Sequence, residues 1–450
     1  INVQTLVSSP RGSFRDLSVQ VLPIRFEIAG EQFYLDANLN NFDNLKYRVH
    51  SKGSLDLGKI YQLFALDGLN VAGKIKSNFS IKGLQNDVQE GNYDKMSSRG
   101  TLQIEKMRFD TDLFPKPYLI QIGLFKFFKE KMIFESFEGS YGSTQFTANG
   151  SLLNVLPYML TQKGQLEGMF TFSSPSLNIN EFMAYAPAAS AKNASASNAG
   201  VVMLPDQTKI AFKATIEEII YDTTKLKNFT GIVKTNGNML ELDSTTFEIA
   251  GAKVLMKGKY EPVKPQKALF DYNIQAHNFD IQSAYDEIEI FRELATSAKN
   301  IHGAVSLDYN LSGRLDANMQ PVMPSLQGEG TFTLENIQFK GFKLLNSISK
   351  ATDKKDLSNA TASNVPIFSK IQNNVITIGK TKMRMAGFRQ RFEGQVTFDG
   401  DINLGFRLGL PPFGIIGIPM TITGNTENYK VKIGKYLQQD LDKLDAEEEE

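Results

Sequence analysis

The sequence predicts a mainly β protein: an antiparallel meander with a few short helices, built from two tandem copies of one pattern. Three observations lead to this fold class. Apolar and polar residues alternate strictly over several segments, and glycine or asparagine turn signals separate these segments. Phenylalanine and glycine are abundant, with 32 and 35 residues, which favours strands over helices. The same series of strands also recurs further along the chain.

The clearest predicted strand covers residues 71–82. Its odd positions carry mostly apolar or small side chains, such as Ile75 and Phe79, whereas its even positions carry mainly lysine, asparagine and serine. Because successive side chains of a strand point to opposite faces, this strand has one dry and one wet face. The same alternation predicts strands at 212–216, 270–274 and 404–410.

Four segments are predicted to be helical: 119–132, 285–299, 342–350 and 435–444. The first is apolar with a basic end, the second is amphipathic, and the last is polar and leads into an acidic tail. Within the first, residues 124–129 place aromatic side chains beside lysines. This arrangement is typical of an interfacial membrane element, and equally of a helix that caps one end of a sheet core.

Internal duplication is predicted from a constant offset of 230 residues. The segments that match at this offset are 71–83 with 301–313, 100–105 with 330–335, and Phe109 with Phe339. Separately, the five letters of 26–30 return unchanged at 247–251. Tandem units of this kind tend to stack, so that an apolar face continues from one copy to the next.

The repeats and a low-complexity segment predict the domain organisation. The first repeat is placed at 1–183 and the second at 206–434. Between them, residues 184–205 are rich in alanine and serine and are expected to form a flexible linker. Residues 435–450 are expected to form the polar helix and the acidic tail.

Composition and motifs point away from catalysis and from nucleic-acid binding. The 49 basic and 49 acidic residues cancel, whereas a nucleic-acid-binding protein normally has a basic excess. Cysteine is absent, and His50, His277 and His302 have no neighbours at metal-ligand spacing. Walker and Rossmann glycine patterns are missing, and the scattered carboxylates nominate no glycosidase pair. The sequence therefore predicts no enzyme, no metal site and no cofactor.

The apolar face of the predicted sheet has to be covered by something. Such a sheet can fold back into a sandwich, close into a barrel or curl around a guest. No apolar run is long enough for a transmembrane helix. An outer-membrane barrel is disfavoured, because tryptophan is absent and the helices and linker interrupt the meander. A closed sandwich core and an exposed apolar trough both stay open.

Six short motifs follow one another in the last third of the chain. They are SLQGEGTFTLEN at 325–336, FKLLNSI at 342–348, PIF at 366–368, FEG at 392–394, GDIN at 400–403 and IPMTITGN at 418–425. In this order, over residues 325–434, they resemble the C-terminal region of AsmA-like proteins. The resemblance rests on strand and glycine spacing, and the first copy echoes only its opening, at 100–109.

The resemblance also implies a cellular location and a function. AsmA-like proteins are similar to bridge-like lipid-transfer proteins, which are built from a long curled sheet, the repeating β-groove. It therefore implies a periplasmic body, tethered to the inner membrane through an N-terminal segment outside this sequence. It also implies phospholipid transport in outer-membrane biogenesis. The expected partner is phospholipid or another membrane lipid, with membrane contact and no nucleic acid; no protein partner is indicated.

The dry-face positions are the candidate lipid-binding groove. They are Val71, Ile75, Phe79, Ile81, Leu102, Ile104, Val305, Leu307, Tyr309, Leu311, Phe332, Leu334, Leu404, Phe406 and Leu408. Acyl chains would lie along these residues, with the headgroups in water. The alternative is a non-catalytic β-sandwich scaffold or an outer-membrane assembly factor. In that case the same residues would form closed cores and no lipid would be bound.

Overall fold

The structure is a computed structural model of the 450-residue chain. It describes residues 4–28, 30–58, 70–90, 92, 95–110, 116–155, 158, 165–183, 200–288, 291–292, 298, 301–339, 343–352, 361–385, 387–410, 416–425 and 428–434. Strands account for most of these residues, and the helices among them are short. The predicted mainly β fold class is therefore confirmed.

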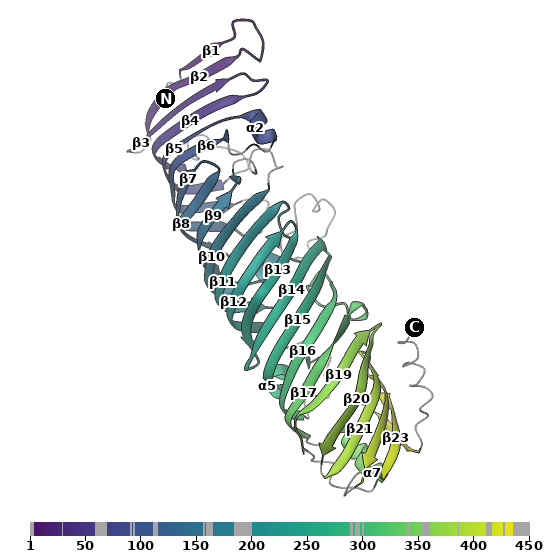
Figure 1. The fold of residues 1–450 in the computed structure, drawn as a ribbon. Helices are drawn as coiled ribbons and strands as arrows, with labels where there is room; N and C mark the ends of the chain where they lie inside the picture. The colour runs from purple at the N-terminus through teal and green to yellow at the C-terminus, as the bar shows by residue number, and fades with distance from the viewer. Residues whose placement is uncertain are drawn as a thin grey trace. The chain divides into compact units, whose positions relative to one another are not determined.

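The described strands belong to one 24-stranded sheet and are labelled in chain order (Figure 1). They are β1 (Thr5–Ser8), β2 (Ser18–Ile28), β3 (Glu31–Asn40), β4 (Lys46–Asp56), β5 (Asn70–Leu84), β6 (Ser97–Asp110), β7 (Tyr118–Phe128), β8 (Lys131–Tyr141), β9 (Thr144–Leu153), β10 (Leu166–Asn178), β11 (Thr208–Tyr221), β12 (Thr224–Asn236), β13 (Met239–Ile249), β14 (Ala252–Lys264), β15 (Lys267–Asp280), β16 (Ile301–Leu315), β17 (Gln327–Phe339), β18 (Thr361–Ala362), β19 (Val365–Gln372), β20 (Val375–Met385), β21 (Phe388–Thr397), β22 (Asp401–Gly409), β23 (Gly417–Asn425) and β24 (Tyr429–Ile433). The helices are α2 (Gln85–Gln89), α4 (Asn180–Met183), α5 (Ile281–Glu287), α7 (Lys343–Thr352) and the 3-10 turn η4 (Met323–Ser325).

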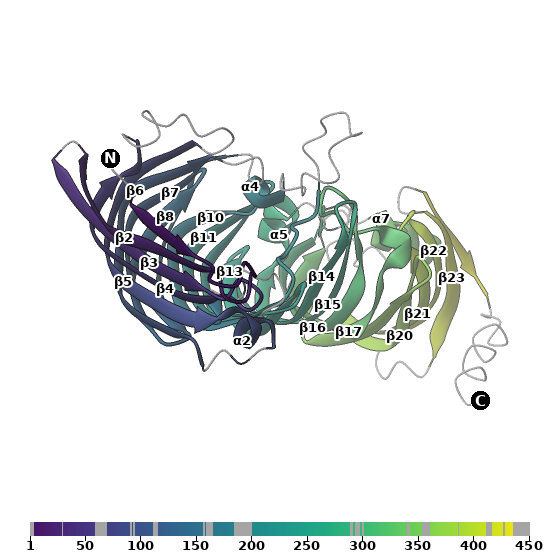
Figure 2. The ribbon, with the colours of Figure 1, turned by 90° about the horizontal axis from the view of Figure 1, so that it is seen from above.

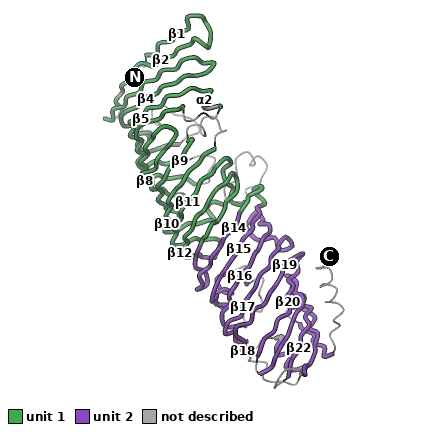
Figure 3. Tube along the Cα trace, viewed as in Figure 1, with its two compact units in different colours: residues 1–221, 227–245, 260–267 green, residues 222–226, 246–259, 268–450 purple. Residues whose placement is uncertain are grey.

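Contacts divide the chain into two compact units (Figure 3). Unit 1 comprises residues 1–221, 227–245 and 260–267, and unit 2 comprises 222–226, 246–259 and 268–450. This division reflects packing and does not test the two predicted repeats, which stay a prediction.

Unit 1 contains an antiparallel meander. From β1 to β10, each strand is hydrogen-bonded to the next one in the chain, and every one of these pairs is antiparallel. Figure 2 shows these strands bending along their length. This arrangement confirms the predicted meander and the curl of its sheet.

One strand pair in unit 1 departs from the predicted antiparallel order. Strands β10 and β11 run parallel, with Leu166 opposite Thr208 and Asn178 opposite Ile220. A parallel pair needs a crossover connection, because a tight hairpin can join only antiparallel strands. The predicted linker at 184–205 belongs to this connection. Its residues 184–199 lie outside the described residues, but Val201 is fully buried and donates its N–H to Pro265 O.

The two predicted copies contain the same backbone irregularity. A bulge in β6 places two residues, Lys106 and Met107, opposite Gly73 of β5. A bulge in β17 likewise places Asn336 and Ile337 opposite Gly303 of β16. Both glycines have a positive φ, 127° and 129°, which residues with a side chain rarely adopt. The bulges are therefore related by the 230-residue offset found in the sequence.

Unit 2 has a core filled by its own side chains. Strands β15 to β17 and β19 to β24 pair antiparallel in chain order, and β18 adds a short pairing to β17. The core gathers apolar residues of these strands together with Ile281 of α5 and Leu345 and Ile348 of α7. Helix α7 therefore helps to cover the apolar face of the last strands.

The helix predictions had mixed outcomes. The prediction for 342–350 is confirmed by α7, whereas 119–132 is wrong: it forms β7, a turn and the start of β8. Pairing explains this difference, because β7 is hydrogen-bonded on both edges, to β6 and to β8. Helix α5 starts before 285–299 and ends at Glu287, and much of the predicted remainder lies outside the described residues. The predicted helix at 435–444 lies outside them entirely.

Candidate functional site

The candidate residues of unit 1 lie on one face of two adjacent strands. In the register of β5 and β6, Ile75 stands opposite Ile104. Phe79, Ile81 and Leu102 follow at even spacing along their strands and share the same face. We call this face, with its continuation on β7 to β11, the apolar face of unit 1. For Val71 the structure describes only the backbone, which pairs with Phe109.

These side chains are half-buried rather than buried. Ile75, Phe79, Ile81, Leu102 and Ile104 all keep an intermediate exposure. Most alternate residues on the opposite face of β5 are charged or polar and exposed, among them three lysines: Lys74, Lys76 and Lys82. The two described helices of unit 1 have only five and four residues, which is too short to cover a sheet of this width. The apolar face of unit 1 therefore stays accessible among the described residues.

An aromatic pair crosses this face above a glycine. Phe79 of β5 and Phe127 of β7 both stand opposite Gly100 of β6, and their ring centroids lie 4.6 Å apart. Gly100 has a φ of 134°, and an added Cβ would overlap Asn78 O and lie 2.7 Å from Phe79 Cα. Glycine is therefore the residue that lets the two rings meet over the middle strand.

The same device recurs three strands further along. Phe134 of β8 and Phe170 of β10 both stand opposite Gly150 of β9, and their ring centroids lie 5.0 Å apart. A Cβ at Gly150 would lie 2.8 Å from Cδ1 of the Phe170 ring. The crossing of two phenylalanine rings over a glycine is therefore a repeated feature of the apolar face of unit 1.

Further phenylalanines join the pair Phe134–Phe170 into what we call the phenylalanine ladder. Its ring contacts are Phe125–Phe134 at 4.9 Å, Phe134–Phe137 at 5.9 Å, Phe137–Phe146 at 6.0 Å, Phe146–Phe172 at 5.6 Å and Phe170–Phe212 at 5.7 Å. These distances fall in the range of favourable aromatic contacts. The rings of the ladder pack against one another from β7 to β11, and two of them, Phe125 and Phe170, are buried at 3% and 7% exposure.

Sequence reasoning missed most of the ladder. The wrong helix prediction for 119–132 is one reason, because it removed Phe125 and Phe127 from the list of strand residues. The other reason is that no strand was predicted for the segments that contain Phe134, Phe137, Phe146, Phe170 and Phe172. The signal was present, because Phe125 and Phe127 alternate with Leu124, Lys126 and Phe128. Phe128 faces the other way and is 52% exposed, close to the charged ends of Arg99 and Lys129.

In unit 2 the candidate residues are more enclosed. Tyr309 is only 4% exposed, and its hydroxyl lies 3.2 Å from Ser369 Oγ. Val305 and Leu334 pack against the core of unit 2 and are themselves half-buried. The remaining candidates on β16 and β17 are also half-buried: Leu307, Leu311 and Phe332. Tyr309 repeats the geometry of Phe79, since it stands opposite Gly330 at the 230-residue offset.

The three candidates on β22 lie inside the core of unit 2. Leu404, Phe406 and Leu408 are 8%, 7% and 0% exposed. They belong to the same buried cluster as residues of α7 and β23. Protein side chains occupy the space around them, so the structure leaves no room for an acyl chain beside these residues.

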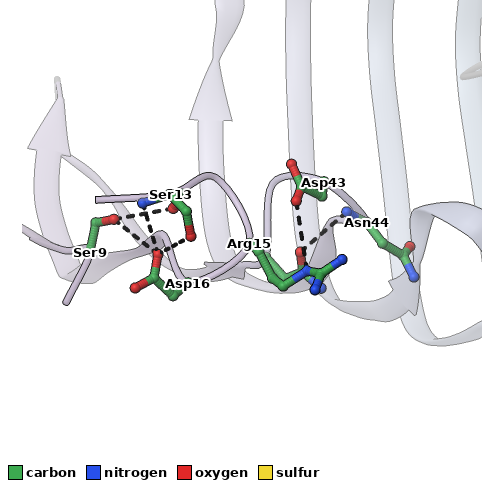
Figure 4. A network of polar contacts seen from close by, with 7 residues as sticks. Ser9, Ser13, Arg15, Asp16, Asp43 and Asn44 are labelled. Atoms are coloured by element: carbon green, nitrogen blue, oxygen red, sulfur yellow. Dashed lines mark hydrogen bonds and ion pairs between the residues drawn. The ribbon is translucent and has the colours of Figure 1, made fainter. Parts of the chain in front are cut away.

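A polar cluster in unit 1 stabilises a turn. Asp16 accepts hydrogen bonds from Ser13 N at 3.1 Å, Ser13 Oγ at 2.6 Å and Ser9 Oγ at 3.2 Å (Figure 4). The hydroxyl of Ser13 is the main cause that lowers the pKa of Asp16, which therefore stays ionised in neutral solution. Arg15 and Asp43 form an exposed ion pair nearby, at 3.9 Å. These contacts fix the connection from β1 to β2.

The described part of the chain offers no metal site. No group of three or more His, Asp or Glu side chains lies there in a position to bind a metal ion. His50 contacts Asp36 at 3.1 Å on the polar face of unit 1, where Ser80 stands opposite His50 in the register. No helix that the structure describes has the length and apolar character needed to cross a membrane.

Comparisons with known proteins identify no family for the chain. No family model matches the chain, and no match was found among curated proteins or solved structures. The resemblance to AsmA-like proteins is neither supported nor refuted by these comparisons.

Proposed function

We propose that this protein binds lipid, with acyl chains lying along the apolar face of unit 1. The observation that carries the proposal is the half-buried state of Ile75, Phe79, Ile81, Leu102 and Ile104. Contiguous exposed apolar surface is costly in water and usually marks a place that binds something. A lipid chain has the matching chemistry, and each CH₂ group that it buries contributes about 0.8 kcal/mol.

The phenylalanine ladder supports an elongated apolar guest. Rings at 4.9 to 6.1 Å from one another extend across neighbouring strands from β7 to β11. Hydrophobic contact is non-directional, so a chain can shift along such a floor without losing specific hydrogen bonds. This property suits transfer as well as storage of lipid.

The filled core of unit 2 favours a second role for that part of the chain. Leu408 and its neighbours on β22 and β23 are closed off by protein side chains. This observation favours the scaffold alternative for the C-terminal strands. We therefore assign the lipid to unit 1 and a structural role to the β22 core.

The cellular setting in our proposal comes from the resemblance described above. It places the protein in the periplasm, tethered to the inner membrane, as a phospholipid carrier in outer-membrane biogenesis. No reaction is proposed, and no cofactor or metal takes part.

The test is native mass spectrometry with lipid extraction on the purified chain. Wild-type protein should carry near-stoichiometric phospholipid. Phe79→Asp should lower the lipid content by about tenfold or more, because a carboxylate beside an acyl chain is strongly unfavourable. The matched control is Asn78→Asp, which adds the same charge to the opposite, exposed face of β5. It should keep its lipid.

The outcomes separate the two functions. A folded, lipid-free wild-type protein would refute lipid binding and favour the scaffold. Equal lipid loss in both variants would show that charge alone, and not the apolar face, governs the binding.

A further inference from the structure

Five basic side chains gather on the polar face of three adjacent strands of unit 2. They are Lys382 and Arg384 on β20, Arg389 and Arg391 on β21, and Arg407 on β22. We call this group the cationic site. Its members alternate with core residues: Arg407 lies between Phe406 and Leu408, whose side chains face the buried cluster. The cationic site therefore faces away from the core of unit 2.

The register brings like charges directly together. Lys382 stands opposite Arg391, Arg391 stands opposite Arg407, and Arg384 stands opposite Arg389. Side chains in direct cross-strand positions have Cβ atoms only about 5 Å apart, and like charges there destabilise a sheet. The described residues that line the site include no carboxylate. The positive charge concentrated on these strands attracts anions.

The choice of arginine narrows the chemistry of that anion. The chain has 12 arginines and 37 lysines, yet four of the five members of the site are arginines. The polar face of β5 shows the usual choice, with lysines at Lys74, Lys76 and Lys82. Guanidinium groups form planar, bidentate hydrogen bonds with phosphate, which an ammonium group cannot do.

The cationic site surrounds a cavity large enough for more than a single ion. The cavity has a volume of about 540 Å³, within the range of small-molecule sites. Ser363 and Asn364, in the turn before β19, also line it and add a hydroxyl and an amide. A phosphate with an attached polar group, such as a glycerophosphate, fits this combination of size and donors.

One arginine of the site is held in place by a glycine. A Cβ on Gly417 would lie 2.8 Å from Nε and 2.9 Å from Cζ of Arg407. The guanidinium of Arg407 therefore lies flat against the backbone of β23, and it is half-buried there. Fixing the donor in advance reduces the entropy lost on binding.

We propose that the cationic site binds phosphate groups, and specifically those of anionic phospholipid headgroups. The proposal rests on the lipid function proposed above and adds a polar recognition site to it, separate from the apolar face of unit 1. Headgroup phosphate at this site accepts hydrogen bonds from the guanidinium groups and brings the last strands of unit 2 to a lipid surface.

The experiment compares binding of the full chain to phosphatidylglycerol vesicles, phosphatidylcholine vesicles and free inorganic phosphate. Vesicle flotation at low ionic strength measures the first two, and calorimetry measures the third. Wild-type protein should bind phosphatidylglycerol vesicles strongly and phosphatidylcholine vesicles weakly. The double variant R389Q/R391Q should bind phosphatidylglycerol about 30-fold more weakly.

The matched control is K257Q/K259Q, which removes two exposed charges from β14 of the same unit. It should change vesicle binding by no more than about twofold. Unfolding temperature is a second readout, because R389Q/R391Q removes like-charge repulsion and should unfold no lower than the wild type. A loss of binding in that variant is then not a loss of fold.

The possible outcomes distinguish a specific phosphate site from general charge attraction, and this inference from the apolar-face proposal. Equal weakening by the two double variants would refute a specific site and leave only general charge attraction. Binding of free phosphate without vesicle binding would keep the phosphate chemistry and refute the lipid source. Unchanged binding in R389Q/R391Q, with lipid still lost in Phe79→Asp, would overturn this inference alone. Lipid-free wild-type protein that still binds phosphatidylglycerol through these arginines would overturn the apolar-face proposal alone.

Discussion

Phe79 and Phe127 bring their ring centroids to within 4.6 Å of each other above Gly100, although a whole strand separates their backbones. Strands two positions apart in a sheet lie about 9.5 Å from each other. The rings have therefore converged, as side chains do on the concave side of a curled sheet. This relationship ties the curl of unit 1 to the phenylalanine floor on which the lipid proposal rests.

The first prediction concerns Gly100. Gly100→Ala should lower the free energy of unfolding by more than about 2 kcal/mol, because the new Cβ overlaps Asn78 O at a φ of 134°. Gly237→Ala is the control: its φ is also positive, at 61°, but nothing lies near its Cβ. It should cost only about 1 kcal/mol. Chemical denaturation of both variants checks this difference, and equal losses would refute the steric argument.

The second prediction separates the enclosed candidates from the open ones. Leu408→Ala should destabilise the protein by about 2 to 5 kcal/mol, the cost of a cavity at a fully buried leucine. Its lipid content should stay unchanged, because Leu408 contacts protein and not guest. Ile81→Ala should show the reverse, a smaller loss of stability and a reduced lipid content, since Ile81 is half-buried on the apolar face of unit 1.

Denaturation and lipid extraction on both variants check the second prediction. Lipid loss in Leu408→Ala, at a temperature where the variant is folded, would contradict the assignment of β22 to a closed core.

Alternation was enough to predict which residues share a face. Ile75, Phe79 and Leu102 could be placed together because a strand has a period of two, whatever lies above it. Their exposure could not be predicted, because it depends on which other segments cover the face. Phe406 has the same alternating pattern as Phe79 and yet is buried, in the same cluster as residues of α7 and β23.

The rest of the fold could not be predicted, because it depends on pairing between strands that the local sequence does not specify. Residues 119–132 are apolar enough for a helix, and only the neighbours β6 and β8 decide that they form a strand. The parallel pair of β10 and β11 follows from a crossover whose length is visible in the sequence but whose path is not. The cationic site escaped notice because Arg384, Arg389 and Arg407 become neighbours only through register.

The third prediction concerns a buried amide in unit 2. Gln390 is 2% exposed, and neither its Oε1 nor its Nε2 has a hydrogen-bond partner among the described residues. It stands between Met383 and Leu408 in the register. An unpaired buried amide costs about 1 to 3 kcal/mol, so Gln390→Met should raise the free energy of unfolding.

Thermal and chemical unfolding of Gln390→Met check this expectation. Gln390→Glu serves as the opposite control, because a buried charge without a partner should lower stability. A destabilised methionine variant would show that the amide has a partner, such as a bound water.

The last prediction is a pH dependence that originates in unit 1. Burial is the main cause that raises the pKa of Tyr118 to about 12, and the nearby Tyr141 adds to it, with ring centroids 5.6 Å apart. The pKa of a tyrosine in the unfolded chain is about 10. Between these values the folded state holds a proton that the unfolded state has lost. Stability is therefore fully present below pH 10 and falls as the pH rises towards 12, by at most about 1.4 kcal/mol per pH unit from this residue.

Tyr118→Phe has no such proton, so its free energy of unfolding should fall less steeply than that of the wild type between pH 9 and pH 11. Urea denaturation across this range gives the two slopes, and their difference isolates Tyr118 from the other titrating groups. Tyr272, whose pKa burial also raises to about 12, gives a matching substitution in unit 2. Because the chain has no tryptophan, absorbance near the tyrosinate band reports these ionisations directly. Identical slopes for wild type and Tyr118→Phe would mean that this ring, whose centroid lies 6.0 Å from that of Phe146, reaches water.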